Sequence, residues 1–435
     1  MTIGSRILST AGSLTIERVT ILAASTITQV FLARTLGSGG FGQISAVLAA
    51  AALLTPLAQG GLSGIVVKAA IDHPEQERAI FETAVWWRLI AATVAAILGI
   101  VIWSTGFSND SQYAAFPLLA IAQITLALQV LELRFLAHER IAELVRIRII
   151  IAVIFAILKI GLAWQTHSIP IVLAVFAAEY AALGTVHLIW CHNIFRDWTR
   201  PRASATWRTW FIARTPWLVI SGFAEAINQK IDIVMLERFR GAHEAGLYAA
   251  AAKISEAWYA VPFLLVTAVF PTIVKAQDEG RLHHNDWQRL LDAMFALTLL
   301  VSVVIQWVAT PLVDLLFGEP FRESASVLAI HAWAGLFVGM RAVLSRWIIT
   351  EDVLWLSTWM ACAGAIVNVG LNLLLIPRHG AQGAAVATAV SYATAAWLAL
   401  FLHERSRLLG KMMFRSLLLP FRLRAVKDYV RVLRA

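Results

Sequence analysis

The sequence predicts an all-α integral membrane protein, with about twelve transmembrane helices of ~20 residues each arranged as two six-helix bundles. Three observations predict this fold class. First, 59% of the 435 residues are hydrophobic, only 14% are charged, and the mean hydropathy is +0.72. Second, long apolar runs recur along the whole chain. Third, the two halves of the chain share a pattern of residues. Soluble domains carry roughly a quarter charged residues, so this class is excluded.

The apolar runs predict helices rather than the strands of a membrane barrel. Each run approaches the ~20 residues with which a helix crosses ~30 Å of hydrocarbon. Barrel strands would alternate polar and apolar residues over ~10-residue segments, and these runs do not alternate. Pro56 and Pro262 are expected to kink two of the spans. The spans are expected at residues 13–35, 42–67, 82–104, 114–136, 145–165, 169–190, 209–237, 245–274, 290–317, 324–346, 353–376 and 380–403.

The cysteines and the first residues of the chain indicate whether disulfides, a metal site or a signal peptide should be expected. Cys191 and Cys362 are far apart and lie in or near apolar segments, so we expect neither a disulfide framework nor a metal site. Residues 1–12 are short and polar, and the span after them is too long for the apolar core of a signal peptide. We therefore expect no cleaved signal peptide.

The distribution of positive charge predicts the orientation in the membrane. The chain has 36 Lys and Arg residues against 27 Asp and Glu residues. Most of the 36 lie on the side that holds both termini, and the loops of the other side carry Arg34, Arg238, Arg240, Arg322 and Arg378. By the positive-inside rule both termini are cytoplasmic, and the number of crossings is even. Because this rule explains the basic balance, we expect no nucleic-acid partner.

The two halves repeat one pattern. An arginine is followed after two residues by a glycine and after four more by a second glycine, and each copy follows the first span of its half. Both copies start on the same side of the membrane, so the repeat is parallel. Transporters often place the substrate path between such halves, while a duplication kept for packing alone is the alternative. The copies are Arg34, Gly37 and Gly42, and Arg238, Gly241 and Gly246.

This repeat divides the chain into four parts. We expect residues 1–190 to form an N-terminal six-helix bundle and residues 209–404 a C-terminal one, joined by a cytoplasmic linker at 191–208. Residues 405–435 mix basic residues with Leu, Met, Phe and Val. This composition predicts an amphipathic tail on the anionic cytoplasmic leaflet, with membrane lipids as its partner.

Four stretches resemble a known family and occur in that family's order. Through them the chain is similar to the polysaccharide-export flippases, which translocate O-antigen or exopolysaccharide repeat units. These belong to the superfamily of multidrug, oligosaccharidyl-lipid and polysaccharide exporters. The resemblance covers nearly the whole chain. The stretches are "LARTLGSGGFGQI" (Leu32–Ile44), "IDIVML" (Ile231–Leu236), "AGLYAAAAKISEAWYAVPFLLVTAVFPTI" (Ala245–Ile273) and "NVGLNLLLIPRHGAQGAAVATAVSY" (Asn368–Tyr392).

The resemblance implies a structure, a substrate and partners. The two bundles would form a V around a central cavity and work by alternating access. The cargo would be an oligosaccharide linked by pyrophosphate to a polyprenyl lipid, moved to the outer leaflet of the bacterial inner membrane for surface polysaccharide such as lipopolysaccharide. Glycosyltransferases or a polymerase of the same pathway would be partners. The related peptidoglycan-precursor flippases usually have two further helices, whereas this chain ends in a basic tail.

Span seven carries charges that lipid alone would not tolerate. A charge at mid-bilayer costs at least ~2.5–3.5 kcal/mol on insertion scales, so such residues face protein or water. At about 100° per residue the polar residues of this span cover about one third of the helix circumference, and we expect them to face the cavity. Lys230 points about 140° away from Glu225, toward another helix or the outer interface. The polar stripe consists of Ser221, Glu225, Asn228, Gln229 and Asp232.

Lys253 is the first expected ligand of the pyrophosphate. It lies ~10 Å inside the outer edge of span eight at 1.5 Å per residue. By the resemblance, it occupies the position of a cavity arginine in the peptidoglycan-precursor flippases. Glu256 is three residues away on the same helix, so a Lys253–Glu256 pair that only stabilises the helix is the alternative.

Further cations are expected at both ends of the path, because a pyrophosphate that crosses lipid needs compensating positive charge at each opening. For the arginines among them, snorkelling to the interface is the alternative role. Asn228 and Asn372 are the expected polar contacts of the cargo, although Asn372 lies one turn from Asn368 and could serve helix packing instead. The cytoplasmic tier is Arg18, Arg88 and Arg214, and the outer tier is Lys159, Lys253 and Lys230.

Three carboxylates are candidates for coupling transport to an ion gradient. Glu179 lies near the middle of span six, and with Glu225 and Asp232 it could bind a proton or a sodium ion. Buried carboxylates near the membrane midplane commonly do so. Neutralisation of the lysines is the alternative. We expect no other cofactor.

Two other functions compete with the flippase. A cation or drug antiporter of the same superfamily should have an acidic, aromatic cavity with few lysines. A polysaccharide polymerase or ligase usually carries a large extracytoplasmic loop, whereas the outer loops here have about ten residues or fewer. The sequence has no glycine motif that cradles phosphate, which argues against ATP hydrolysis. We therefore expect a transporter and not an enzyme.

Overall fold

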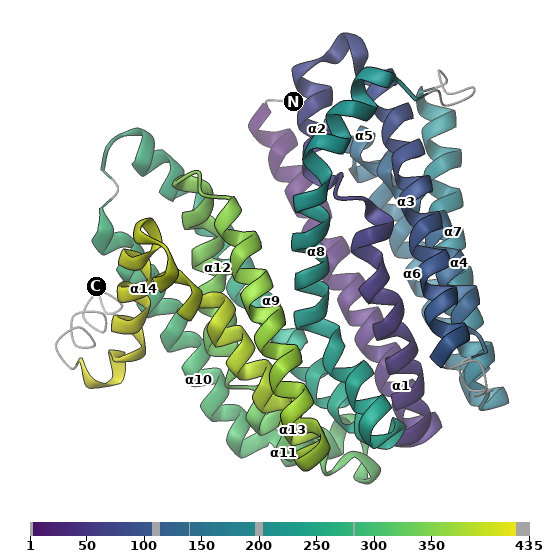
Figure 1. Cartoon of the computed structure of the whole chain (residues 1–435), viewed down its shortest axis with the longest axis vertical. Coiled ribbons are helices and arrows are strands. Elements are labelled where there is room, and N and C mark those ends of the chain that lie inside the picture. Colours follow the sequence, from purple (N-terminus) through teal and green to yellow (C-terminus); the bar gives the residue numbers. More distant parts are fainter. Residues whose placement is uncertain (1–2, 107–113, 139, 196–202, 282, 423–435) are drawn as a thin grey trace. The chain divides into compact units, whose positions relative to one another are not determined.

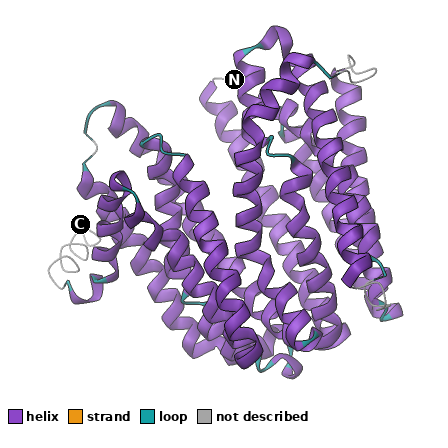
Figure 2. Cartoon of the chain, in the orientation of Figure 1, coloured by secondary structure: helices purple, strands orange, loops and turns teal. Residues whose placement is uncertain are grey.

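The computed structural model describes residues 3–106, 114–138, 140–195, 203–281 and 283–422 of the chain. Every element within these residues is helical (Figure 2), which confirms the predicted all-α class. Parts of the expected linker and of the expected tail, residues 196–202 and 423–435, lie outside the described residues.

The helices follow one another with short connections. The first half forms α1 (Ile3–Gln59), α2 (Ser63–Asp72), η1 (Pro74–Gln76), α3 (Glu77–Gly106), α4 (Phe116–Leu126), η3 (Ala127–Leu131), α5 (Glu132–Ala137), α6 (Ala142–Thr166) and α7 (Ile169–Phe195). The second half forms α8 (Ala205–Arg240), α9 (Ala242–Asp278), α10 (His284–Phe317), η4 (Glu319–Phe321), α11 (Ser324–His331), α12 (Ala334–Thr350), α13 (Trp355–Ala396), η5 (Leu398–Leu402), α14 (Glu404–Leu417) and η6 (Leu419–Phe421).

The apolar helices account for the predicted spans. In the described part of the chain, nine helical segments are long and apolar enough to cross a membrane. Two of them, α1 and α13, each hold two predicted spans, because non-helical glycines break them at Gly37 and Gly380. Helix α8 is also long enough to span, at 36 residues, but it carries several charges and is not among the nine.

The first glycine of the repeat has the same backbone conformation in both halves. Gly37 has φ 69° and ψ 178°, and Gly241 has φ 88° and ψ 172°. Glycine alone enters this region readily, because a Cβ would clash there. The repeat therefore marks a corner at the end of the first span of each half. Helix α1 breaks at Gly37, and α8 ends directly before Gly241.

Some predicted ends of the spans are wrong for identifiable reasons. The span expected at 42–67 stops at Gln59, because Gly60 and Gly61 have φ of 60° and 68° and end the helix. The span expected at 324–346 agrees with the apolar segment Ser324–Thr350, in which a turn after His331 separates α11 from α12. Helix α9 continues through Pro262 without a break.

The chain folds into two compact units, Met1–Ala226 (the first unit) and Ile227–Ala435 (the second unit). In the first unit α1 packs beside α3 and α6, and α4 packs beside α3 and α7 (Figure 1). Its core includes Phe81 together with Trp207 and Phe211 from the start of α8. Because these two aromatic side chains belong to this core, the division falls within α8 rather than in the expected linker.

In the second unit, α12 packs against α9, α10 and α13, and α11 lies beside α9, α10 and α13 (Figure 1). The core contains Leu291, Met340 and Leu344, and also Leu409 and Met413 of α14. The described part of the predicted tail is thus a helix that packs on the bundle, and it contacts α10 and η5.

Candidate functional site

The first unit contains a pocket of about 420 Å³ between α1 and α6, which we call the α1–α6 pocket. Four of its lining side chains are charged, and they come from three separate helices. Ser25, Ile21 and Leu22 of α1 complete the lining. The charged residues are Glu17 and Arg18 of α1, Glu132 of α5 and Arg148 of α6.

Arg148 holds the walls of this pocket together. Its guanidinium donates a hydrogen bond to Glu17 Oε2 at 2.7 Å and another to Glu132. Glu132 also lies 3.6 Å from Nε2 of the buried His187 on α7, and it attracts the buried Arg88 of α3. Buried carboxylates are stable only when they are paired. Arg148 therefore fixes α1, α5 and α6 around the pocket.

Arg18 is the positively charged residue of the pocket whose side chain an incoming anion can reach. Its side chain is exposed, and no ion pair joins it to a carboxylate among the described residues. With Arg88 behind Glu132, the surroundings of the pocket hold three arginines and two glutamates. Two arginines and two glutamates line the pocket itself, and a guanidinium can bind two oxygens of a phosphate at once.

The second unit contains a buried polar network around Asp232 of α8. Its carboxylate accepts hydrogen bonds from Tyr248 Oη and Thr388 Oγ1, both at 2.8 Å, and from Asn372 Nδ2. Asn372 Nδ2 also donates to Asn368 Oδ1 at 2.9 Å. Each of these five residues is at most 2% exposed. The network joins α8, α9 and α13 inside the unit.

The Asp232 network has the donor atoms of a cation site. Carboxylate, amide and hydroxyl oxygens are the ligands that hard cations prefer. Asn372 Oδ1 is buried and has no hydrogen-bond partner in the described part of the chain, so one oxygen is available there. Among the described residues no group of three or more His, Cys, Asp and Glu side chains could hold a metal ion. The network itself contains one carboxylate, and its other donor groups are amides and hydroxyls.

The structure corrects two sequence interpretations at this place. The polar stripe of α8 is predicted to face a cavity, but Asp232 and Asn228 face their own bundle. Asn228 Nδ2 donates to Ala361 O at 2.9 Å, and the residue is 2% exposed. Asn372 is predicted to contact the cargo, but it is 0% exposed and bonds Asp232 instead. The spacing of polar residues in the sequence identifies the polar face of a helix. It does not identify which other helix packs against that face.

Lys230 and Lys253 share one carboxylate in the second unit. Lys230 Nζ lies 2.9 Å from Glu256 Oε1, which joins α8 to α9. Lys253 interacts electrostatically with both Glu256 and Lys230. The short contact of Glu256 with Lys230 therefore crosses from α9 to α8. The cluster brings two lysines and one glutamate together.

Lys159 and Glu179 neutralise each other inside the first unit. Lys159 Nζ lies 2.5 Å from Glu179 Oε2, and the ammonium also sits 4.0 Å from the centroid of the Phe176 ring. The pair joins α6 to α7, and its side chains are 8% and 15% exposed. Because each charge has its partner, we place neither residue in the proposed site.

Arg214 and Glu225 are two further charged residues of α8. Arg214 is exposed, and its guanidinium lies over the ring of Trp210 at 4.3 Å from the centroid. This contact is typical of an arginine at a membrane interface, where indole rings also gather. Glu225 is half-buried.

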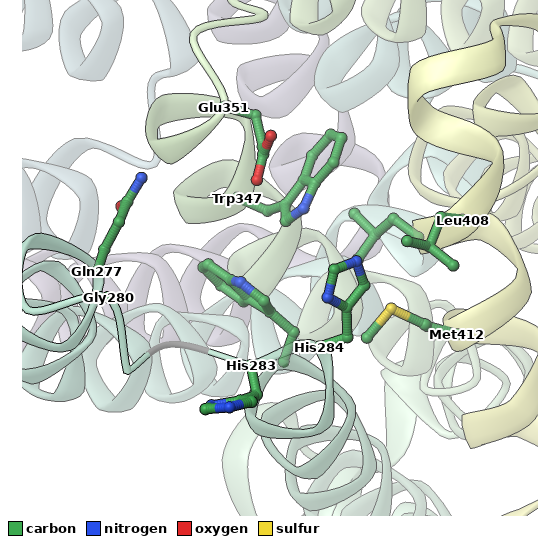
Figure 3. A pocket seen from close by; sticks show the side chains of 10 residues that line it. Gln277, Gly280, His283, His284, Trp347, Glu351, Leu408 and Met412 are labelled. Carbon is green, nitrogen blue, oxygen red and sulfur yellow. The ribbon is translucent and has the colours of Figure 1, made fainter.

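A second pocket, of about 190 Å³, lies in the second unit where α9, α10, α12 and α14 meet. Figure 3 shows His284, Trp347, Glu351 and Met412 around it. None of its lining residues is a lysine or an arginine. Unlike the α1–α6 pocket, it offers no fixed positive charge to an anionic group.

Comparison with known proteins identifies the family of the chain. Residues 8–277 match the family model described as polysaccharide biosynthesis protein. The chain belongs to this family. A relative, the probable lipid II flippase MurJ of Thermotoga maritima, is 27% identical over 149 residues. The aligned part spans 32% of this chain and 31% of the relative, which is about a third of the length of each.

Solved structures share the fold of this polysaccharide biosynthesis protein. A lipid II flippase MurJ in an inward closed conformation has a TM-score of 0.69 at 14% identity, and the match covers 96% of this chain and 93% of that chain. An inward-facing multidrug resistance MATE family transporter of the MOP superfamily has a TM-score of 0.64 at 12% identity, with 93% and 99% covered. At these identities the likeness concerns the fold, which is that of a multi-pass membrane protein.

Arg148, the residue at the centre of the α1–α6 pocket, is not predicted from the sequence as a site residue. It falls within the span predicted at 145–165, and in the structure it lies in the second turn of α6. The signal that could have found it is the pair of glutamates. Glu17 and Glu132 fall in the predicted spans 13–35 and 114–136, and each needs a cation at its own depth.

Proposed function

We propose that this protein is a flippase that moves a polyprenyl-pyrophosphate-linked oligosaccharide from the cytoplasmic to the outer leaflet of the bacterial inner membrane. The cargo would serve surface polysaccharides such as O-antigen or exopolysaccharide. The observation that carries the proposal is the α1–α6 pocket, where the exposed Arg18 lies beside Arg148. Membership of the polysaccharide biosynthesis protein family and the fold likeness to a lipid II flippase support it.

The pocket would recognise the pyrophosphate and leave the sugars to the rest of the path. Charge-assisted hydrogen bonds from arginine to phosphate are short and strong, and they can be bidentate. Arg18 makes the first contact because it is exposed. Arg148 is bonded to Glu17 and Glu132, so an arriving pyrophosphate competes with these carboxylates for its guanidinium. This competition lets the pocket release the cargo after binding it.

The second unit would supply a further anion contact and the coupling ion. The cluster of Lys230, Glu256 and Lys253 brings two lysines together with one glutamate, and we assign Lys253 to the pyrophosphate. We assign Asp232 to the coupling ion, since its network consists of oxygen donors from α8, α9 and α13. The half-buried Glu225 is the second candidate carboxylate.

A cation or drug antiporter is the second candidate function. The fold likeness to MATE transporters and the buried Asp232 favour it. The exposed Arg18 of the α1–α6 pocket argues against it, because this guanidinium would repel a positively charged cargo.

Binding of a polyprenyl-pyrophosphate lipid to the purified protein tests the proposal. Native mass spectrometry would compare the wild type with Arg18→Gln. Loss of a hydrogen bond to a charged group lowers affinity about tenfold or more. Arg214→Gln is the matched control, because Arg214 is also an exposed arginine of the first unit. Equal affinity of wild type and Arg18→Gln, or tighter binding of a cationic drug than of the lipid, would overturn the proposal.

A further inference from the structure

Helix α14 has two faces with different surroundings. The inner face is buried against the second unit, and its Leu409 and Met413 belong to the core. The outer face carries Arg407, Lys411 and Arg415, which are exposed. These three recur every four residues, so they form one stripe along the helix. We call them the α14 stripe.

The inner face is fixed by a buried carboxylate. Asp292 of α10 has a side chain that is 0% exposed. Ser416 Oγ donates to Asp292 Oδ1 at 2.6 Å, and Arg422 Nη1 lies 3.1 Å from Oδ2. Gln288 of α10 bonds both Asp292 Oδ1 and Ser416 Oγ at 2.9 Å. A buried charge needs such partners, so α14 is held in one position on the bundle.

The outer face combines positive charge with apolar side chains. Within the described part of the chain, no carboxylate forms an ion pair with the α14 stripe. Beside the stripe, Phe414 is 48%, Leu418 40% and Phe421 81% exposed. Basic residues next to exposed aromatic and aliphatic residues are the composition of helices that lie in a membrane interface.

The position of α14 along α10 also indicates the interface. Helix α10 has 34 residues. At 1.5 Å per residue its length is about 50 Å, which exceeds the ~30 Å of the hydrocarbon. The helix therefore extends beyond the hydrocarbon, and its first turns, which hold α14, carry the polar residues His284, Asn285, Asp286, Gln288, Arg289 and Asp292. A tryptophan also contacts α14, since Trp397 Nε1 donates to Gly410 O at 3.1 Å and its ring stacks on Phe414.

We propose that the α14 stripe binds the headgroups of anionic phospholipids in the leaflet that it faces. Phe414, Leu418 and Phe421 then enter the boundary between headgroups and acyl chains. Each cation near an anionic membrane surface adds roughly fivefold to the affinity, so the three together add roughly 100-fold. The bound molecules are lipids of the surrounding membrane and not the transported cargo. The proposal therefore does not depend on the identity of the cargo.

Lipid competition on the full-length protein tests this proposal. The purified protein would be offered equal amounts of phosphatidylglycerol and phosphatidylcholine, and the retained lipids counted by native mass spectrometry. The variant is Arg407→Gln/Lys411→Gln/Arg415→Gln. The matched control is Lys275→Gln/Arg281→Gln/Arg289→Gln, which removes the same charge from exposed residues of the same unit.

The wild type and the control variant are expected to prefer phosphatidylglycerol, and the stripe variant to lose at least tenfold of that preference. Lys411→Gln alone, which leaves the contacts of Asp292 intact, is expected to lose roughly fivefold. The proposal would be overturned if the stripe variant kept the wild-type preference for phosphatidylglycerol, or if the control variant lost as much of it. It would also be overturned if the wild-type protein bound polyglutamate, an acidic peptide, but showed no preference for phosphatidylglycerol.

Discussion

Arg148 of α6 donates a hydrogen bond to Glu17 of α1 at 2.7 Å, across 131 positions of the chain. The same guanidinium bonds Glu132, so one cation satisfies two carboxylates from different helices. This arrangement forms the α1–α6 pocket and explains why Arg18 beside it is left open to an anion. The structure of the first unit and its proposed chemistry therefore depend on the same guanidinium.

Replacing Arg148 is expected to destabilise the protein. Arg148→Gln removes the cation that Glu17 and Glu132 share. Glu17 is buried, and removal of one partner of a buried ion pair costs about 3–5 kcal/mol. Thermal unfolding in detergent measures the loss. The double variant Arg148→Gln/Glu17→Gln should recover part of it, because one of the unpaired charges is gone. Equal melting of Arg148→Gln and wild type would show that the network adds no stability.

The repeated glycines offer a second test. Gly37→Ala places a Cβ at φ 69°, which costs about 1–3 kcal/mol. Gly241→Ala, at φ 88°, is expected to cost as much. Gly39→Ala is the control, since its added Cβ meets nothing within 4 Å and its φ is not positive. If Gly37→Ala and Gly39→Ala unfold at the same temperature, the corner does not require glycine.

Asp232 is expected to bind the coupling cation. A ligand that binds the folded state alone stabilises it by about 2.7 kcal/mol at 100 times its dissociation constant. The melting temperature of the wild type should therefore rise when sodium chloride replaces choline chloride, and Asp232→Asn should abolish this rise. Glu225→Gln separates the two candidate carboxylates and should keep it. If sodium still raises the melting temperature of Asp232→Asn, the sodium ion binds at a site that does not include Asp232.

Lys159 and Glu179 are expected to serve stability rather than transport. Lys159→Met leaves Glu179 buried without a partner and should cost about 3 kcal/mol or more. Lys159→Met/Glu179→Met should recover most of the loss, because two apolar side chains replace the pair. Transport per folded molecule should stay at the wild-type level in the double variant. If the double variant is stable but does not transport, Lys159 or Glu179 takes part in transport, contrary to this prediction.

The sequence predicted the helices because a backbone in lipid must satisfy its own hydrogen bonds, which makes every span a long apolar run. It also placed Gly37 and Gly241 at matching positions of a repeat, and the structure gives both a conformation that glycine alone adopts readily. Local composition determines both features, so one stretch of sequence is enough to recognise them.

The pairing of the charges could not be predicted in the same way. Glu256 is three residues from Lys253, yet its short contact is with Lys230, 26 positions away. Asp232 faces Thr388, 156 positions away. Which partner a buried charge finds depends on which helices pack together. The sequence therefore indicated that partners were needed without indicating which ones.

Transport in proteoliposomes tests the central claim most directly. The purified protein would be reconstituted with a fluorescent polyprenyl-pyrophosphate oligosaccharide, and a membrane-impermeant quencher would report the fraction that changes leaflet. The account predicts translocation by the wild type and by Arg214→Gln, and a rate at least tenfold lower for Arg18→Gln. Translocation by Arg18→Gln at the wild-type rate, or a wild type no faster than protein-free vesicles, would contradict it.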